Sequence, residues 1–546
     1  MYMNSTLQLN PLVRVVAMLI LGIALGDVLA DVVGVRIWLG IFVVAVAAAF
    51  VAYNTNVRPM VQSLMLFGCI IICGALRMSM SVERSHFYFI QTSEPFSAVV
   101  SSMPVERTKT LRCELTIADG RFAGHRVYAY LPKGKDANNI SALSIGDGIV
   151  GYTQFLDIDD YSSQHGAYNK GGAYNIATHF DYQRWLKVHD IVARCFLRDG
   201  AWQRDVVQLD HLSGVQRVQL RCMTLREKLL KRYRELAISN EAYGVVAAMT
   251  LGDKSSLTAE LRESFSVSGA SHVLALSGLH LGILYALLVM IFGRRRHNIL
   301  MSAFIIIAVW GYTAMVGMPL SLLRSAFMLT LFTFAQMLQR NNMSLNYLAF
   351  AALVLLLASP WSLWDVGFQM SFLAVLGILL FNERLRVFVS HKYLETHPLV
   401  NWCFSMIVVS LSAQLMVAPL VAYYFGRFSC YFLLSNFIAI PLATVLIYLS
   451  VVMYALFFVP FLQGLVAIAV GWIAKALTLS LAWVSSLPAA SVDGIELSNV
   501  QLWLVYLVVA VVYALLFYLE KIYKPFDNFQ PRVYLFQYFR TGTILS

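Results

Sequence analysis

The sequence predicts a polytopic α-helical membrane protein of about twelve spans, with an inserted, small, outward-facing β-barrel of the OB type. Of its 546 residues 59% are hydrophobic and only 13% are charged, whereas a typical soluble domain has about 25% charged residues. The apolar residues gather in runs long enough to cross about 30 Å of hydrocarbon. One polar stretch, residues 77–240, separates two groups of such runs. This composition excludes an ordinary soluble enzyme and a disordered chain.

Three apolar runs precede the polar stretch and nine follow it. The first three, at about 12–29, 37–53 and 60–76, make up an N-terminal membrane segment, 1–76. The later runs form a bundle, 272–519, that is followed by a tail, 520–546; they cover about 272–293, 298–317, 320–338, 344–358, 366–381, 402–422, 431–458, 461–484 and 501–519. The total is uncertain by about two, because residues 242–271 are also apolar enough to enter the membrane.

Lysine and arginine in the short loops predict the orientation, since cytoplasmic loops carry an excess of them. If the N-terminus is cytoplasmic, only Arg36 and Arg427 fall outside. The residues that then fall inside are Arg58, Arg294, Arg295, Arg296, Arg340, Arg384, Arg386, Lys392, Lys521 and Lys524. We therefore expect both termini in the cytoplasm and residues 77–240 on the outer side.

Short alternating runs in the outer domain, 77–216, are typical of β-strands. Residues 111–117, 126–131 and 148–155 are separated by turn signals rich in glycine and aspartate. This pattern fits an OB-type barrel, and it fits a sandwich equally well. The domain carries 15 Lys or Arg and 15 Asp or Glu residues, so it is not generally electropositive. Aromatic residues suit base stacking, but we expect most of them to form the barrel core: Phe122, Tyr128, Tyr130, Tyr152 and Phe155.

Basic residues gather at the start of the next segment, 217–271. Leucines recur there at roughly helical spacing, which indicates an amphipathic basic helix. Such a helix can adhere to anionic lipid head groups, or it can form a collar that holds phosphates at a pore mouth. Composition alone favours adhesion to lipid. The cations are Arg217, Arg221, Arg226, Lys228, Lys231, Arg232 and Arg234.

Three of the seven cysteines lie in the outer region, in an oxidising compartment that permits disulfides. The most plausible disulfide there joins Cys113 to Cys195. Cysteines in or beside apolar runs are expected to be packing residues. Since no pair has the spacing of a metal site, we expect no metal ion and no cofactor.

The most unusual stretch, at 261–282, reads LRESFSVSGASHVLALSGLHLG. It places His272, Ser277 and His280 among glycines at the start of an apolar run, where polar side chains usually face a cavity or a neighbouring helix. The glycines permit close helix packing or a break in the helix. Ser277 and His280 stand three residues apart, as a nucleophile and its base do on one helical face. No third member is identifiable, so we expect no catalytic residue here.

Further polar residues recur inside the later apolar runs. A single one often only bonds a neighbouring helix, but the set predicts a bundle with a polar interior and interrupted helices, as transporters and channels have. Interruptions are expected after the Ser-Pro-Trp sequence at 359–361 and near Pro419 and Pro441. The polar residues are Arg324, Asp365, Gln369, Gln414, Asn436 and Lys475.

Several motifs together resemble the ComEC competence family, membrane channels that bring single-stranded DNA into bacteria during natural transformation. They are HVLALSGLHLG at 272–282, PLSLLRSA at 319–326, SPWSLWDVGFQMSFLAV at 359–375 and SNFIAIPLAT at 435–444, in the family's order. The sequence FDYQRWL at 180–186 is similar to the end of the family's outward, OB-like domain. The resemblance covers nearly the whole chain. It implies a protein of the bacterial cytoplasmic membrane that binds DNA, which composition alone did not indicate.

The sequence departs from this family in one respect. Many members continue into a C-terminal metallo-β-lactamase-type domain that is proposed to degrade one strand. Here only residues 520–546 follow the last apolar run, and no His-x-His pair occurs. We therefore expect a channel that is not an enzyme, with a separate nuclease if a strand is degraded. Since no Gly-x4-Gly-Lys-Ser/Thr loop is present, the resemblance implies a cytoplasmic helicase-type motor, and an outer DNA-receptor protein as a further partner.

The predicted function is conduction of single-stranded DNA. The outer domain and the basic helix receive the strand, the bundle encloses it beside Arg324 and Lys475, and Arg294, Arg295 and Arg296 meet it at the cytoplasmic exit. A small-molecule or lipid transporter is the first alternative, and it would need no basic outer helix. An intramembrane hydrolase that uses Ser277 and His280 is the second. A host that is not transformable would use the protein for another transport task.

Overall fold

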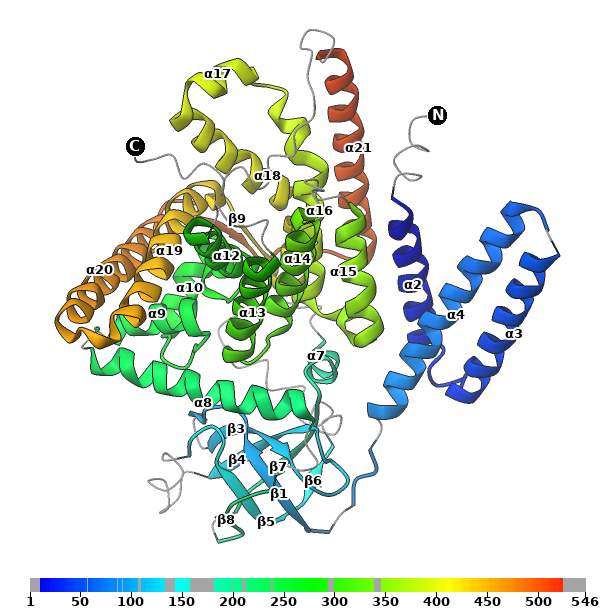
Figure 1. Cartoon of the computed structure of the whole chain (residues 1–546), viewed down its shortest axis with the longest axis horizontal. Coiled ribbons are helices and arrows are strands. Elements are labelled where there is room, and N and C mark those ends of the chain that lie inside the picture. Colours follow the sequence, from blue (N-terminus) through cyan, green and yellow to red (C-terminus); the bar gives the residue numbers. More distant parts are fainter. Residues whose placement is uncertain are drawn as a thin grey trace. The chain divides into compact units, whose positions relative to one another are not determined.

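The structure is a computed structural model that describes residues 10–55, 57–85, 87–90, 92–106, 110–132, 143–157, 181–198, 200–208, 213–236, 238, 240–292, 299–337 and 345–523. The described part is mostly helical and also contains an eight-stranded and a two-stranded sheet (Figure 1). The chain divides into two compact units. Unit 1 comprises Met1–Gly172, Asp181–Leu220 and Ser344–Gln369, and unit 2 comprises Ala173–Phe180, Arg221–Met343 and Met370–Ser546.

Three long apolar helices begin unit 1: α2 (Pro11–Val28), α3 (Val35–Asn54) and α4 (Pro59–Ser85). Helices α2 and α4 approach closely because glycines line their contact. A Cβ atom at Gly22 would lie 2.1 Å from the Ile71 carbonyl oxygen, and one at Gly26 would lie 2.6 Å from the Ala75 carbonyl oxygen. Small residues four positions apart allow membrane helices to pack in this way. A further apolar helix of the unit, α15 (Leu345–Ala358), packs against α2.

The sheet of unit 1 curls back on itself. Its central strand β1 pairs antiparallel with β3 and β5, β3 pairs antiparallel with β4, and β4 pairs in parallel with β7. One residue separates the end of β5 from the start of β6. Strand β6 pairs with β7, and β5 pairs with β1, so the chain of strand pairs returns to β1 through these two consecutive strands. The strands are β1 (Glu94–Val100), β2 (Val105–Glu106), β3 (Thr110–Ile117), β4 (Arg126–Pro132), β5 (Gly148–Thr153), β6 (Phe155–Leu156), β7 (Ile191–Phe196) and β8 (Trp202–Arg204).

The aromatic residues of this sheet have different surroundings. Phe122 and Phe155 lie in the core, with ring centroids 4.8 Å apart. Tyr128 lies on the other face of β4, where helix α7 (Tyr182–Val188) covers it. Tyr152 is 65% exposed, so its assignment to the core is wrong; side chains alternate along a strand, and its neighbour Thr153 is the buried one. Tyr130 is half-buried and stacks on Phe196, with ring centroids 5.2 Å apart.

Unit 2 contains most of the remaining helices. One apolar core joins α8, α9, α10, α11, α19 and α20, and a second joins α12, α13 and α14. The helices of this part are α8 (Gly214–Glu235), α9 (Asn240–Leu251), α10 (Ala259–Val267), α11 (Ser271–Leu274), α12 (Gly278–Phe292), α13 (Ile299–Met315), α14 (Leu320–Met337), α16 (Val366–Arg386), α17 (His391–Thr396), α18 (Pro398–Phe425), α19 (Phe432–Ala455), α20 (Pro460–Ser485) and α21 (Asn499–Tyr523). Helices α8 and α16 each begin in unit 1.

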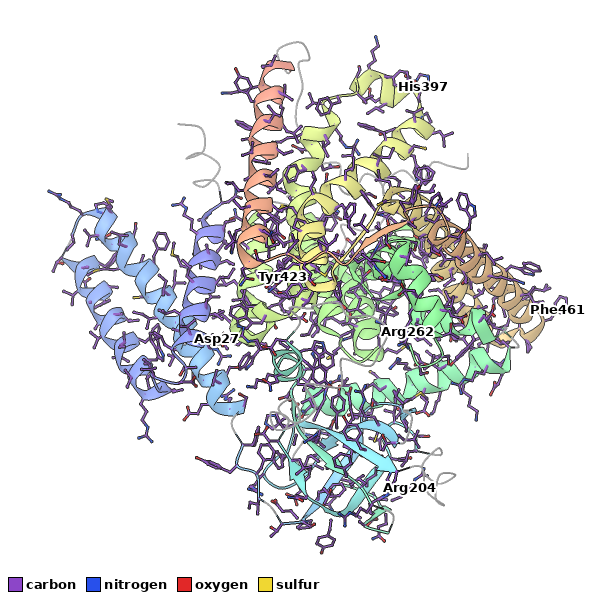
Figure 2. All side chains as sticks on the ribbon, turned by 180° about the vertical axis from the view of Figure 1, so that it is seen from behind. Asp27, Arg204, Arg262, His397, Tyr423 and Phe461 are labelled. Atoms are coloured by element: carbon purple, nitrogen blue, oxygen red, sulfur yellow. The ribbon has the colours of Figure 1, made fainter. Side chains whose placement is uncertain are left out.

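Each apolar run corresponds to a helix, but the helices differ in length. Within the described residues, nine are long and apolar enough to cross a membrane: α2, α3, α4, α14, α16, α18, α19, α20 and α21. Helices α12, α13 and α15 are apolar but shorter, so the total of twelve spans stays a prediction. Large apolar side chains are exposed along the long helices, as at Phe461 on α20 (Figure 2). Such a surface is suited to lipid.

The expected interruptions are only partly present. Helix α15 ends at Ala358, and a 3₁₀ turn, η3 (Pro360–Trp364), separates it from α16. In contrast, α18 and α19 continue through Pro419 and Pro441, so the interruptions expected there are wrong. Proline is tolerated inside membrane helices where neighbouring groups satisfy the carbonyl that it frees.

The predicted disulfide between Cys113 and Cys195 is absent, because both are free thiols buried in the core of the eight-stranded sheet. They pair with the same residue, Ala129, from opposite sides. Two strand spacings, roughly 9.6 Å, therefore separate their Cα atoms, and a disulfide requires about 7 Å or less. Burial raises the pKa of Cys113 to about 12 and raises that of Cys195 as well.

We expect Cys113 and Cys195 to resist a thiol reagent in the folded protein at pH 8 and to react after denaturation. The exposed Cys430 serves as the reactive control. Because the pKa of Cys113 rises from 9.0 to about 12 on folding, its contribution to stability is complete below pH 9 and is lost as the pH rises toward 12. Mass-spectrometric mapping of maleimide adducts measures the rate at which each cysteine is labelled. Labelling of Cys113 as fast as Cys430 would contradict the buried thiol.

Candidate functional site

The unusual glycine-rich stretch forms a broken helix in unit 2. Helix α10 ends at Val267, α11 lasts for four residues, and α12 begins at Gly278. Two features produce the breaks. Gly269 has a φ of +82°, and Ala275 is extended, with φ −84° and ψ 135°. A Cβ atom at Gly269 would also lie 2.8 Å from the Cβ of Ser429. A side chain at this position is therefore disfavoured both by the positive φ angle and by the lack of space.

A break in an apolar helix leaves backbone carbonyls without their usual partners, and side chains satisfy them here. The Ser435 hydroxyl donates to the Ser268 carbonyl at 2.6 Å, and the Ser321 hydroxyl donates to the Leu276 carbonyl at 2.9 Å. Nδ1 of His272 donates to the Gly269 carbonyl at 3.2 Å. An unsatisfied polar backbone group in lipid costs several kcal/mol. The broken helix therefore depends on these three side chains, which satisfy its free carbonyl groups.

Ser277 and His280 lie at the start of α12 and contact each other. The Ser277 hydroxyl is 3.1 Å from Nδ1 of His280, and the Ser277 backbone N–H donates to the same nitrogen at 3.4 Å. A side chain at the third helical position that accepts from the N-cap backbone is half of a capping box. No group of three or more His, Cys, Asp or Glu residues suited to a metal occurs among the described residues. The contact with the Ser277 backbone N–H gives His280 the geometry of a helix-capping residue.

Helix α14 contacts the second half of the break. A Cβ atom at Gly278 would lie 2.5 Å from the Ser325 hydroxyl oxygen, so α12 and α14 cross closely at this point. Arg324, between the two serines of α14, is only 3% exposed. A buried guanidinium within a membrane helix is costly and usually faces protein or water. The structure thus brings together three of the motifs singled out in the sequence, at 272–282, 319–326 and 435–444.

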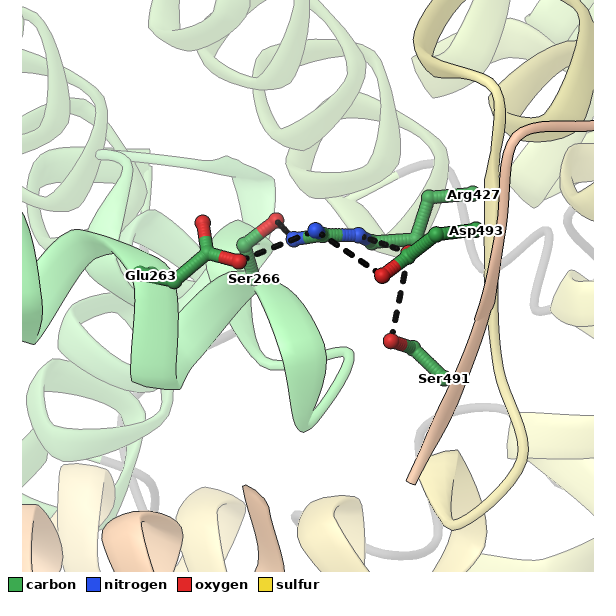
Figure 3. A network of polar contacts seen from close by, with 5 residues as sticks. All are labelled: Glu263, Ser266, Arg427, Ser491 and Asp493. Carbon is green, nitrogen blue, oxygen red and sulfur yellow. Dashed lines mark hydrogen bonds and ion pairs between the residues drawn. The ribbon is translucent and has the colours of Figure 1, made fainter. Parts of the chain in front are cut away.

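An ion-pair cluster holds the other end of the broken helix (Figure 3). The Arg427 guanidinium binds Glu263 of α10 at 2.9 Å and Asp493 at 2.5 and 3.3 Å, and it donates to the Ser266 hydroxyl at 2.9 Å. Strands β9 (Arg427–Ser429) and β10 (Ser491–Asp493) pair so that Arg427 lies opposite Asp493. Sequence reasoning missed this cluster, because its members lie up to 230 residues apart and no spacing signals their contact.

Two predicted pore residues lie in unit 1 and cap a helix. The Asp365 carboxylate accepts from the Phe368 backbone N–H at 2.8 Å, as an N-cap residue does for α16. The Gln369 amide donates to the Leu363 carbonyl at 2.9 Å. Nearby, Arg184 of α7 pairs with Asp27 at 3.1 Å and lies 4.7 Å from the Trp364 ring centroid. The motifs at 180–186 and 359–375 therefore meet in unit 1.

The remaining predicted pore residues lie on α18, α19 and α20. Gln414 is half-buried in α18, and the Asn436 amide donates to the Ser410 hydroxyl at 3.3 Å. Lys475 lies on an exposed face of α20, where its ammonium is 5.9 Å from the Trp472 ring centroid. The three arginines at 294–296 lie outside the described residues.

The basic helix α8 has two kinds of cation. At 100° per residue, Arg217, Arg221, Lys228 and Lys231 fall within an arc of about 80°, and all four are exposed; Arg234 is exposed beside this arc. Arg226 and Arg232 instead bind inside the protein, to the Leu251 carbonyl at 2.6 Å and the Gln463 amide oxygen at 2.7 Å. Burial lowers the pKa of Arg226, and the nearby charge of Asp253 opposes that shift. The amphipathic helix is confirmed, with fewer free cations than the sequence suggested.

The long apolar helices and the inserted sheet define a multi-pass membrane protein that also contains an eight-stranded β-sheet. The competence protein family matches residues 249–522, half of the chain, and this region contains both the broken helix and the Arg427 cluster. The chain belongs to this family.

Two relatives share about half of the chain. ComE operon protein 3 of Bacillus subtilis is 26% identical over 270 residues, which cover 48% of this chain and 32% of that protein. Recombination protein 2 of Haemophilus influenzae is 23% identical over 244 residues, which cover 43% of this chain and 31% of that protein. The matched part thus spans about a third of the length of these relatives. No solved structure matches the chain significantly.

Ser435→Ala is expected to lower the free energy of unfolding by about 1–3 kcal/mol, because it leaves the Ser268 carbonyl unsatisfied. Thr444→Ala, in the same helix, is the control, because the Thr444 hydroxyl donates to the Ile440 carbonyl of its own helix, four residues back, at 2.8 Å. Chemical denaturation of the purified, detergent-solubilised protein measures the free energy of unfolding of both variants. Equal losses for the two variants would contradict the part assigned to Ser435.

Proposed function

We propose that this chain conducts single-stranded DNA across the bacterial cytoplasmic membrane during natural transformation. One observation carries the proposal: the region that matches the competence family is the region in which three separate motifs meet around a broken helix. Broken helices with polar contacts are typical of membrane transport proteins, because non-helical backbone is tolerated only where protein or a water-filled cavity surrounds it.

The finer architecture is part of the proposal. The strand order of the eight-stranded sheet, with one parallel pair between β4 and β7 and a return through β6, supports an OB-like barrel. The loop charges support an outward position for residues 77–240 and cytoplasmic termini. Twelve spans require the short helices α12, α13 and α15 to cross the membrane with flanking residues or local thinning.

Helix α8 is the proposed receiver of the strand. Its exposed stripe consists of Arg217, Arg221, Lys228 and Lys231, while its opposite face buries Leu230 and Tyr233 in the core. Cations at successive helical turns neutralise phosphates by displacing counterions, whatever the sequence of the strand. An aromatic pair of the β domain, Tyr130 and Phe196, adds a surface on which bases stack.

Conduction itself needs a hydrated path with fixed positive or dipolar groups, since a phosphate in hydrocarbon is prohibitively costly. Arg324 is the buried cation nearest in sequence to the serines that contact the broken helix. Energy and strand processing are assigned to partners: a cytoplasmic helicase-type motor, an outer DNA receptor and, where one strand is degraded, a separate nuclease. The proposal gives this chain no catalytic step.

The decisive experiment is transformation of a naturally transformable host that carries the gene. Deletion should abolish uptake of single-stranded DNA into the cytoplasm while leaving binding of DNA at the cell surface unchanged, and the restored gene should recover uptake. Undiminished transformation in the deletion strain would discard the channel and favour the small-molecule or lipid transporter. Uptake of labelled DNA and counts of transformants are the two measurements.

Changing Arg221, Lys228 and Lys231 together to glutamine should weaken binding of single-stranded DNA to the purified protein. The slope of log affinity against log salt should fall by about 2, because three phosphate contacts are lost at about 0.7 each. The control changes three other exposed cations, Arg36, Arg58 and Lys392, to glutamine. An equal fall in the control would show a general charge effect and no binding surface on α8. Fluorescence anisotropy at several salt concentrations measures the slope.

A further inference from the structure

A cavity of about 340 Å³ lies within unit 1. The end of α4 forms one wall with Ser81 and Arg84, and the end of α15 and η3 form a second with Ser359 and Trp361. The eight-stranded sheet and α7 complete it. Two charged residues of that third wall are Lys187 and Asp190.

The cavity lies where apolar helices end. Helix α4 is apolar over most of its length and becomes polar only in its last turns, which carry Glu83 and Arg84. Helix α15 is apolar up to Ala358. The Arg77 guanidinium ties the two helices together, since it donates to the Leu357 carbonyl at 2.7 and 3.0 Å. Tryptophan is enriched at the level of lipid head groups, and Trp361 lies in this wall.

Among the described residues that line the cavity, the lysine, arginine and aspartate charges are balanced and of both signs. Arg84 and Lys187 supply two cations, and Asp157 and Asp190 supply two carboxylates. The ammonium of Lys187 is 5.7 Å from the Trp361 ring centroid, and the carboxylate of Asp190 is 2.8 Å from Nδ1 of His125. The two carboxylates would repel a polyanion such as DNA, and Arg84 and Lys187 would repel a simple cation. A group that carries a phosphate and an ammonium together satisfies both pairs.

We propose that this cavity binds the head group of a zwitterionic phospholipid with a primary ammonium, of the phosphatidylethanolamine class. Arg84 and Lys187 bind the phosphate, Asp157 and Asp190 accept hydrogen bonds from the ammonium, and the acyl chains follow the apolar surfaces of α4 and α15. The site depends on the membrane assignment and is independent of DNA conduction. A bound lipid would join the membrane helices of unit 1 to its β domain.

The test uses the purified full-length protein in detergent, with short-chain phosphatidylethanolamine, phosphatidylcholine and phosphatidylglycerol as probes and inorganic phosphate as a fourth. Phosphatidylethanolamine should raise the melting temperature at the lowest concentration. Phosphatidylcholine should be weaker because its methylated ammonium donates no hydrogen bond, and phosphatidylglycerol because it lacks the cation. Phosphate alone should have no effect. Equal potency of phosphatidylglycerol and phosphatidylethanolamine would overturn the proposal.

Two pairs of substitutions separate the two halves of the site. Arg84→Gln with Lys187→Gln should weaken binding of all three lipids by at least about tenfold, because charge-assisted hydrogen bonds to the phosphate are lost. Asp157→Asn with Asp190→Asn should abolish only the preference for phosphatidylethanolamine over phosphatidylglycerol. The control is Arg204→Gln, which removes an exposed cation on β8 paired with Asp147 at 3.7 Å. Unchanged lipid binding in both double variants would overturn the site.

A short oligothymidylate competitor distinguishes lipid from DNA. If it displaces phosphatidylethanolamine, and if the Arg84 and Lys187 double variant loses the oligonucleotide as well, the cavity binds the strand and the lipid proposal is wrong. If the oligonucleotide leaves lipid binding unchanged, the lipid site stands whether or not the chain conducts DNA.

Discussion

The need to satisfy backbone carbonyls at a break in an apolar helix governs the structure of unit 2. Ser268 and Leu276 lie on either side of α11, and each carbonyl accepts a hydrogen bond from a serine of another helix. These donors are Ser435 of α19 and Ser321 of α14. The two serines are more than 100 residues apart in the chain. Because water does not reach carbonyls in lipid, the break fixes which helices surround it. Helix packing and the local conformation therefore depend on each other.

Charge serves two separate purposes in this chain. Arg427 is 7% exposed and binds two carboxylates, from α10 and β10, whose side chains are 41% and 44% exposed. Loss of either carboxylate would leave a buried guanidinium with one partner fewer, which costs more than loss of a fully exposed pair. The stripe on α8 is the opposite case, since its cations are exposed. Exposed cations contribute little to stability, and they are available for phosphates. Exposure is thus the property that separates structural arginines from those suited to binding.

The polar residues within the helices contact different partners. Ser277, His280, Ser321 and Ser325 gather at the contact of α12 and α14, whereas Asp365 and Gln369 cap α16 in the other unit. Lys475 points to the exterior of α20 beside Trp472. A lysine on that face would need a partner or water, since an isolated charge in lipid is costly. These polar residues therefore serve different contacts: Ser325 lies where α12 and α14 cross, and Asp365 caps α16.

Periodicity and hydropathy in the sequence determined the apolar helices, strands β3, β4 and β5 and the amphipathic character of α8, because each is set by neighbours within a few residues. The motifs at 272–282, 319–326 and 435–444 were also recognisable individually. Tertiary structure alone decided that these motifs meet, that Arg427 lies opposite Asp493, and that Arg226 and Arg232 turn inward. It also separated Cys113 from Cys195 by an intervening strand. These contacts join residues far apart in the chain, and only the packing of whole helices and strands brings them within hydrogen-bonding distance.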